Sequence, residues 1–151
     1  MLDSSGRGLK ATLARAPVYL VKPNLDELEE LVGRSLNNTT AGAAAQGLVK
    51  SGAAKIVAVT LGADGAILAT ETGLLFMPAL KTEVMSAVGA GDSFLGAMLF
   101  ALSQGWQPEK AFAFGMAGGA AALLHKGTKL CRRSDVERLF GGMIVPAAAP
   151  A

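Results

Sequence analysis

The chain has 151 residues, enough for one domain, and its 51% hydrophobic and 17% charged residues exclude a disordered protein. A formal net charge of +2 gives no argument for a nucleic-acid or membrane partner. The single cysteine excludes a disulfide within the chain, and we expect a reducing, cytoplasmic setting.

Neither a signal peptide nor a membrane span is expected. The first residues lack a basic start followed by an apolar run. The charge-free apolar stretch over 111–124 is shorter than the roughly 20 residues that span a bilayer, so we interpret it as a buried helix. Because we find no internal repeat and no linker, we expect one domain over 1–145 and a disordered tail over 146–151.

Hydrophobic periodicity and turn residues predict helices and strands along the whole chain. The short apolar runs over 18–21 and 56–61 are rich in residues that favour buried strands. In chain order, the predicted elements are the end of a strand at 2–3, a helix over 6–16, a strand over 18–21, helices over 25–32 and 41–50, a strand over 56–61, a hairpin over 66–69 and 74–77, and helices over 94–102, 109–124 and 135–140.

This order of elements predicts an α/β fold in which a sheet carries helices on both faces. Ligands of such sheets bind beyond the carboxyl ends of the strands. Four stretches are predicted to lie at such ends: 3–5, 22–24, 60–62 and the loop before Asp92.

Capping residues predict where several helices begin. Asn24 is a good N-cap for the helix that follows it, and the run over 37–40 predicts a turn and a cap. Ser134 is predicted to cap the last helix, with Glu137 three residues later completing a capping box.

The stretch VGAGDSF over 88–94 has the residue types of an anion site next to a base. Its small residues leave backbone N–H groups uncovered, and the first turn of the following helix adds free donors and a partial positive charge. Asp92 would repel a phosphate there, but a base beside a phosphate can take the proton of an attacking hydroxyl. On this stretch alone, a structural helix cap is an equally good interpretation.

Two further stretches have residues suited to a nucleotide. Lys22 ends a predicted buried strand and can neutralise phosphate charge, unless it is a surface lysine. Asn24 and Glu27 share a helix face, where the carboxylate can hold Mg²⁺ directly or through water; simple capping explains their spacing equally well. In TLGADG over 60–65, two glycines can let a nucleotide lie close to the backbone, although a plain turn is as good an explanation.

Other motifs are not expected to carry chemistry. GRGLKA over 6–11 matches a dinucleotide fingerprint, but Asp26, the acid about 20 residues later, is predicted to lie inside a helix and not at a strand end. The sequence has no Walker A motif. His125 and Cys131 have no metal-ligand spacing, so we predict structural roles for both.

Together the motifs resemble the ribokinase/PfkB family of carbohydrate kinases. VGAGDSF is similar to the family's C-terminal signature, KPNLDE over 22–27 to the stretch with its N-x-x-E motif, and TLGADG to its nucleotide-binding turn. FGMAGG over 114–119 and GTKLC over 127–131 are similar to the ending of the family's minor, PfkB-type 6-phosphofructokinase branch. The resemblance covers nearly the whole chain, from residue 2 to about 140.

The resemblance implies a ribokinase-like α/β fold, with ATP and Mg²⁺ as cofactors and K⁺ as a further cation in several members. It also implies transfer of phosphate to a sugar phosphate, with fructose 6-phosphate converted to fructose 1,6-bisphosphate. Fructose 1-phosphate and tagatose 6-phosphate are alternative acceptors.

The resemblance further implies residue roles. Asp92 would be the base, and the amides of Gly89, Ala90 and Gly91 would form the anion hole for the transferred phosphoryl group. Lys22, Asn24 and Glu27 would serve the ATP phosphates and Mg²⁺, with Glu27 holding the metal through water. The nucleotide pocket would be lined by Thr60, Gly62, Gly65, Gly119 and Ala120. The monovalent cation would be held at Ser86, Val88, Ala122 and Gly127, although His125 replaces a more usual amide-type residue there.

Family members are considerably longer. Their N-terminal part holds most sugar-binding residues, the first strands of the sheet and a small β lid that also forms the dimer contact, and none of this is in the sequence. We therefore keep two hypotheses: a sugar-phosphate kinase, or an inert fragment that binds a nucleotide or another subunit. The lack of the first strands would leave a sheet edge and an apolar face without partners, so we expect self-association.

Overall fold

The computed structural model describes residues 6–126, 130–147 and 149. Contacts within the chain divide it into two compact units. The first unit comprises the residues up to Met77 together with 148–151, and the second comprises Pro78–Ala147. The predicted strand end at 2–3 lies outside the described residues.

The first unit contains a mixed sheet and three α-helices in its described residues. The strands follow the order β1-β2-β3-β4, in which β1 and β2 are parallel and the later pairs are antiparallel. The elements are α1 (Gly6–Arg15), β1 (Val18–Val21), α2 (Leu25–Val32), α3 (Asn38–Lys50), β2 (Ala54–Thr60), the 3₁₀ turn η1 (Gly62–Asp64), β3 (Ala66–Thr70) and β4 (Gly73–Met77). The mixed α/β class and the predicted hairpin are confirmed.

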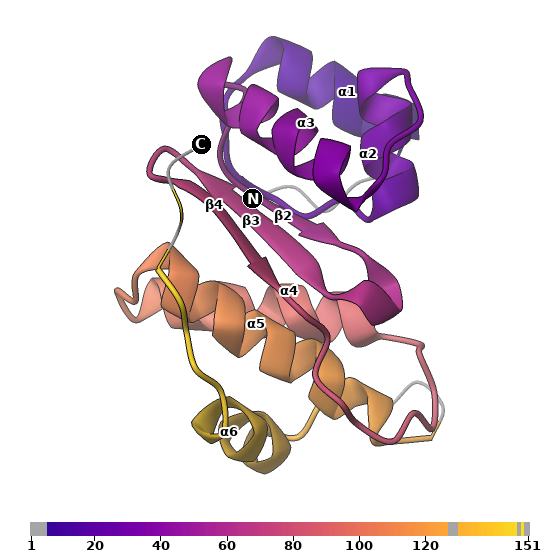
Figure 1. The fold of residues 1–151 in the computed structure, drawn as a ribbon, viewed down its shortest axis with the longest axis vertical. Helices are drawn as coiled ribbons and strands as arrows, with labels where there is room; N and C mark the ends of the chain where they lie inside the picture. Colours follow the sequence, from indigo (N-terminus) through magenta and orange to yellow (C-terminus); the bar gives the residue numbers. More distant parts are fainter. Residues whose placement is uncertain (1–5, 127–129, 148, 150–151) are drawn as a thin grey trace. The chain divides into compact units, whose positions relative to one another are not determined.

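Small residues bring α3 close to the sheet. Ala41 and Ala45 are fully buried in the core of this unit, beside Val57 and Ala69 of the sheet. A Cβ added at Gly42 would lie 3.4 Å from a methyl carbon of Leu74, so the helix and β4 are in close contact there. Figure 1 shows α1, α2 and α3 gathered on one side of the strands. Burial of this face stabilises the unit by the hydrophobic effect.

The second unit contains α4 (Ala90–Ser103), α5 (Pro108–Leu123) and α6 (Arg133–Gly141). Glycines allow α4 and α5 to lie very close together. A Cβ added at Gly118 would lie 2.6 Å from the Cβ of Ala97 and 2.7 Å from the carbonyl oxygen of Ser93. The two helices therefore meet backbone to backbone, beside the first turns of α4.

An aromatic cluster joins α5, α6 and the loop between α4 and α5 in the second unit. Phe114 of α5 stacks edge-on against Trp106 and against Phe140 of α6, with ring centroids 5.4 and 5.3 Å apart. Such pairs contribute about 0.5–1.5 kcal/mol beyond their burial. The cluster holds α6 on α5 and on the loop between α4 and α5.

The structure corrects two predicted helix starts. The cap predicted within 37–40 is confirmed, because Asn37 and Thr40 form a capping box in which each side chain accepts the other's amide, at 2.9 and 2.8 Å. The run over 38–40, however, is the first turn of α3, so the helix begins earlier than the predicted residue 41. Ser134 does not cap the last helix. Its N-cap is Arg132, which has no capping side chain, and the Glu137 carboxylate is engaged by Arg133 at 2.8 Å.

The division into one domain and a disordered tail stays a prediction. Of the tail, Ala149 forms a two-way backbone bridge with Leu74, with N···O distances of 2.9 and 2.8 Å.

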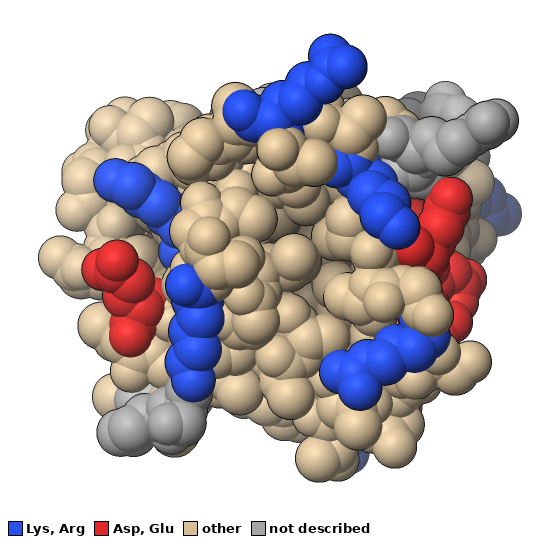
Figure 2. Space-filling view, turned by 90° about the horizontal axis from the view of Figure 1, so that it is seen from above, with Lys and Arg blue, Asp and Glu red and all other residues tan. Residues whose placement is uncertain are grey.

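None of the helices in the described residues is long and apolar enough to cross a membrane. On the face drawn in Figure 2, Lys and Arg side chains are spread out and acidic side chains lie among them.

Candidate active site

Asp92 lies in the first turn of α4, as predicted. The turn before it depends on Gly89, whose φ of 81° is in the left-handed region that favours glycine. The Asp92 side chain is exposed to solvent. A carboxylate at this place is stabilised by the helix dipole and is available to a ligand.

The amides around Asp92 are mostly free. Among the described residues, the amides of Gly89, Gly91 and Asp92 donate no hydrogen bond, and the amide of Ala90 makes a long one of 3.4 Å to the Ala87 carbonyl. Free amides at a helix N-terminus form a site for an anion. The amides of Gly89 and Gly91 are therefore available for the expected anion hole, which stays a prediction, and the Asp92 amide is a further free donor that sequence reasoning missed.

Gly119 of α5 lies directly behind this turn. A Cβ added there would lie 3.3 Å from the carbonyl oxygen of Ala90, so two glycine-rich stretches that are far apart in the sequence meet. Ala120 is 7% exposed. The structure thus gives Gly119 a packing role beside the anion site, and leaves its expected nucleotide contact untested.

In the first unit, the carboxyl ends of β1 and β2 lie side by side. The Thr60 amide donates to the Pro23 carbonyl at 3.0 Å, and Asn24 and Thr60 form a parallel bridge. Two of the four predicted strand-end stretches therefore come together. The stretch over 3–5 lies outside the described residues.

Lys22 is only 8% exposed at this edge of the sheet. Among the described residues, no hydrogen bond or ion pair to its ammonium group is present. A lysine this deeply buried is rare without a partner, because desolvation of the charge is costly. The burial excludes the surface-lysine alternative and is consistent with an anionic ligand.

Asn24 and Glu27 form the capping box of α2. The Asn24 side chain accepts the Glu27 amide, and the Glu27 Oε2 accepts the Asn24 amide, both at 2.8 Å. The capping explanation of their spacing is therefore confirmed. The second carboxylate oxygen of Glu27 makes no hydrogen bond within the described chain, so a metal ligand role is compatible with the cap. No cluster of three or more His, Cys, Asp and Glu side chains suited to a metal occurs in the described part.

The predicted turn over 60–65 forms the 3₁₀ turn η1. Gly62 and Gly65 both have positive φ, of 59° and 120°, which explains why glycine is required at both ends. Asp64 accepts a hydrogen bond of 3.2 Å from the Asn38 side chain at the start of α3. Nothing in the sequence pattern indicated that Asn38 would support this turn.

The expected monovalent-cation residues are partly brought together. The Met85 amide donates to the Leu123 carbonyl at 2.8 Å, which ties the segment of Ser86 and Val88 to the end of α5, where Ala122 lies. The Ser86 hydroxyl accepts the Val88 amide at 3.3 Å. Gly127, the fourth expected residue, lies outside the described residues.

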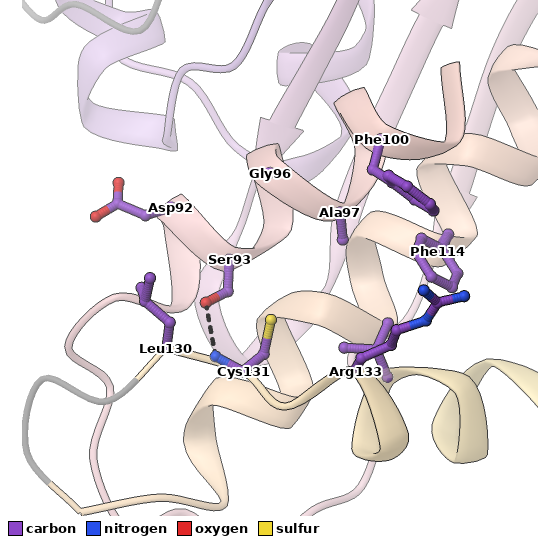
Figure 3. Close-up of a pocket in the computed structure, with 10 residues that line it drawn as sticks. Asp92, Ser93, Gly96, Ala97, Phe100, Phe114, Leu130, Cys131 and Arg133 are labelled. Carbon is purple, nitrogen blue, oxygen red and sulfur yellow. Dashed lines mark hydrogen bonds between the residues drawn. The ribbon is translucent and has the colours of Figure 1, made fainter. Parts of the chain in front are cut away.

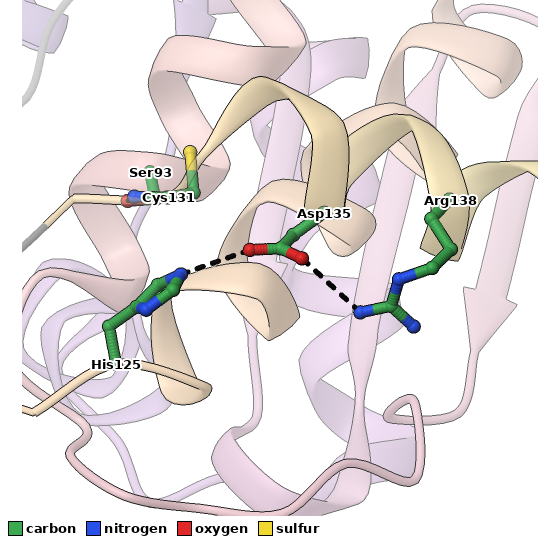
Figure 4. Close-up of polar contacts among 5 residues, drawn as sticks. All are labelled: Ser93, His125, Cys131, Asp135 and Arg138. Atoms are coloured by element: carbon green, nitrogen blue, oxygen red, sulfur yellow. Dashed lines mark hydrogen bonds and ion pairs between the residues drawn. The ribbon is translucent and has the colours of Figure 1, made fainter.

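His125 has a structural partner. Its Nε2 lies 3.0 Å from Oδ2 of Asp135, and Arg138 approaches the other carboxylate oxygen at 3.4 Å (Figure 4). The hydrogen bond from His125 lowers the pKa of Asp135, and Arg138 adds to this, while partial burial opposes it. These contacts fasten the start of α6 to the end of α5.

A pocket of about 360 Å³ adjoins the Asp92 turn within the second unit (Figure 3). Its walls are mostly apolar, and Asp92, Ser93 and Arg133 are also among its lining residues. Sequence reasoning missed Arg133 and the wall residues. One available signal was the four-residue spacing of Asp92, Gly96 and Phe100, which places all three on one face of a helix.

Comparisons with known proteins agree with this fold. A model of the pfkB family carbohydrate kinases matches residues 1–135. The chain therefore belongs to this family of sugar kinases.

Relatives include the ATP-dependent 6-phosphofructokinase isozyme 2 of Escherichia coli, 40% identical over 93% of this chain, and the 1-phosphofructokinase of Borreliella burgdorferi, 35% identical over 93%. The crystal structure of E. coli phosphofructokinase-2 in complex with potassium is similar over 92% of this chain, with a TM-score of 0.88 and 41% identity. The match covers 46%, 45% and 45% of these three proteins, so the chain spans less than half of their length.

Proposed function

We propose that the chain holds the nucleotide and supplies the catalytic base in an ATP-dependent kinase of a sugar phosphate. The acceptor we favour is fructose 6-phosphate, which would become fructose 1,6-bisphosphate, a reaction of glycolysis in the cytoplasm. The observation that carries the proposal is the exposed Asp92 carboxylate, which adjoins the free amides of Gly89 and Gly91 at the start of α4.

In this mechanism Asp92 takes the proton of the acceptor hydroxyl while the hydroxyl oxygen attacks the γ-phosphorus of ATP; the bond from that phosphorus to the β–γ bridging oxygen breaks, and ADP leaves. The free amides of the turn donate to the oxygens of the transferred phosphoryl group, where negative charge is stabilised in the transition state. Because these donors are fixed by the helix start, little reorganisation is needed.

The first unit would bind the ATP phosphates and Mg²⁺. Lys22, buried and unpaired among the described residues, would neutralise phosphate charge. Glu27 keeps one carboxylate oxygen outside its capping bond, so it can hold Mg²⁺ directly or through water, with Asn24 beside it. When bound, Mg²⁺ would neutralise the phosphates. Thr60, Gly62 and Gly65 would contact the nucleotide in this unit, and Gly119 and Ala120 are proposed as nucleotide contacts in the second unit.

A monovalent cation is proposed at Ser86, Val88, Ala122 and Gly127. The support is indirect: the E. coli phosphofructokinase-2 structure contains potassium, and this chain ties the segment of Ser86 to the end of α5. Replacement of K⁺ by a larger organic cation should then lower turnover.

A second candidate is an inert nucleotide-binding fragment. It is favoured by the match to only 46% of the E. coli 6-phosphofructokinase isozyme 2. The resemblance to 1-phosphofructokinases supports fructose 1-phosphate as an alternative acceptor. Tagatose 6-phosphate is another alternative.

The deciding experiment incubates the 151-residue chain with ATP, Mg²⁺ and each of the three sugar phosphates, and ADP formation is measured. Turnover by the chain alone refutes the inert fragment, and the preferred acceptor is the one with the largest kcat/KM. Calorimetric titration with ATP and no acceptor runs in parallel. ATP binding without turnover supports the fragment, and absence of both refutes the nucleotide-binding role.

A further inference from the structure

We propose that the pocket between α4, α5 and α6 binds a small aromatic ligand with one negatively charged group. The pocket adjoins the proposed base Asp92, which is one of its lining residues, but the proposal concerns the apolar walls and the α6 side of the pocket and does not depend on the proposed function. It rests on the size of the pocket, its walls, and the distribution of charge around it.

The pocket has the size and lining of a small-molecule site. Its volume of about 360 Å³ falls within the roughly 300–1,000 Å³ typical of such sites. Phe100, Phe114, Leu130 and Val136 form its walls. Phe100 is 47% exposed and Leu130 is 63% exposed, so large apolar surfaces face solvent when the pocket is empty. Their burial would favour an apolar ligand.

The geometry of the wall favours a ring. Phe100 and Phe114 have centroids 6.4 Å apart and planes tilted by 36°. Aromatic pairs at such spacings are attractive when they are offset or edge-on. A sugar or a nucleotide phosphate chain needs many polar partners, and among the lining residues Asp92, Ser93 and Arg133 alone carry side-chain oxygen or nitrogen atoms. An aromatic body is therefore the better match.

Positive charge lies on the α6 side of the pocket. The guanidinium carbon of Arg133 is 5.9 Å from the centre of the Phe100 ring. The N-cap Arg132 has no capping side chain, and among the described residues the amides of Arg133 and Ser134 donate no hydrogen bond. The helix start and the guanidinium together favour an anionic group on the ligand.

The neighbouring acids do not cancel this charge. Both carboxylate oxygens of Asp135 are engaged, by His125 and Arg138 (Figure 4). In Figure 3 the Asp92 carboxylate points away from the other labelled side chains. Glu137 pairs with Arg133 at 2.8 Å, but the two side chains are 53% and 79% exposed, so the pair is weak and a ligand anion can compete with it.

Two fluorescent probes test the proposal with the full 151-residue chain. One is 8-anilino-1-naphthalenesulfonate, and the other is N-phenyl-1-naphthylamine, the same ring system without the sulfonate. We expect saturable binding of both, with the sulfonate bound more tightly.

Gly96 gives a blocking variant. It lines the pocket, is exposed, and has open space where a Cβ would be added, so G96L should fold and fill the pocket. Gly47 on α3 has equally open surroundings and provides the control G47L. G96L should weaken binding of both probes at least about tenfold, as expected for loss of most of the buried contact area. Equal binding by G96L and G47L overturns the proposal.

The role of charge is tested by two substitutions that should change binding of the sulfonate probe in opposite directions. R133Q should weaken the sulfonate about three- to fivefold, the range for an exposed charge pair, and should leave the neutral probe unchanged. E137Q frees Arg133 and should tighten the sulfonate about twofold, again without effect on the neutral probe. Equal effects on the two probes overturn the assignment of an anionic ligand.

Discussion

The contact of α4 with α5 makes Gly118 the position where an added side chain should do most damage. A Cβ at Gly118 would lie 2.6 Å from Ala97 Cβ and 2.7 Å from Ser93 O, whereas carbon contacts are normally about 3.5–4 Å. Valine adds two more carbons to this overlap of about 1 Å. Overpacking costs about 1–3 kcal/mol or somewhat more, and the better helix propensity of valine returns only a few tenths. We expect G118V to lower the free energy of unfolding by about 3 kcal/mol.

Thermal unfolding followed by circular dichroism measures this change. For a chain of this size, about 3 kcal/mol corresponds to a fall in Tm of roughly 6–12 °C. The matched control is G96V, because Gly96 lies in α4 with no atom within 4 Å of an added Cβ. G96V should change the free energy of unfolding by no more than about 0.5 kcal/mol. Equal losses in the two variants would show that α4 and α5 do not pack as described.

Further predictions concern the cap, the acid response and association. N24A should lower the free energy of unfolding, measured by urea denaturation, by about 1 kcal/mol, because it removes the acceptor of the Glu27 amide. E27Q keeps the capping box and should lower the free energy of unfolding by less. Equal losses in the two variants would contradict the cap. In ATP titrations, E27Q should weaken binding only when Mg²⁺ is present, and a loss without Mg²⁺ would refute a metal role. The hydrogen bond from His125 lowers the pKa of Asp135. The stability that this bond contributes is therefore complete above the ordinary carboxyl pKa and is lost as the pH falls through the lowered pKa of Asp135. D135N should therefore flatten the acid side of the plot of Tm against pH, and an unchanged slope would count against the pair. Finally, β1 pairs only with β2 among the described residues, and Tyr19 of β1 is 51% exposed. Because an open strand edge can pair with another chain, light scattering at high concentration should show self-association. A strict monomer would refute this prediction.

Local chemistry predicted much of the fold because it acts over a few residues. Asn24 begins its helix as expected, and the hairpin follows its turn residues. The prediction failed at Ser134, where the spacing to Glu137 suggested a capping box. A competing partner four residues before Glu137, Arg133, takes the carboxylate, and spacing alone does not rank the two contacts.

The remote parts of the site could not be predicted in the same way. Asp92 and its glycines form a contiguous motif, and their place at the start of α4 followed from it. The bond of Asn38 to Asp64 joins residues 26 positions apart, and the pocket joins α4 to Arg133, about 40 positions later. Such contacts arise from tertiary packing, which has no local pattern.

The central claim is that Asp92 removes the proton of the acceptor hydroxyl. It is tested most directly by D92N in an enzyme that contains this chain together with a sugar-binding half, with kcat and the Kd for ATP measured side by side. A general base contributes about 10²–10⁴-fold, so kcat should fall by that factor while ATP binding and Tm stay nearly unchanged. A D92N enzyme with near-normal kcat would contradict the claim and remove Asp92 from the mechanism.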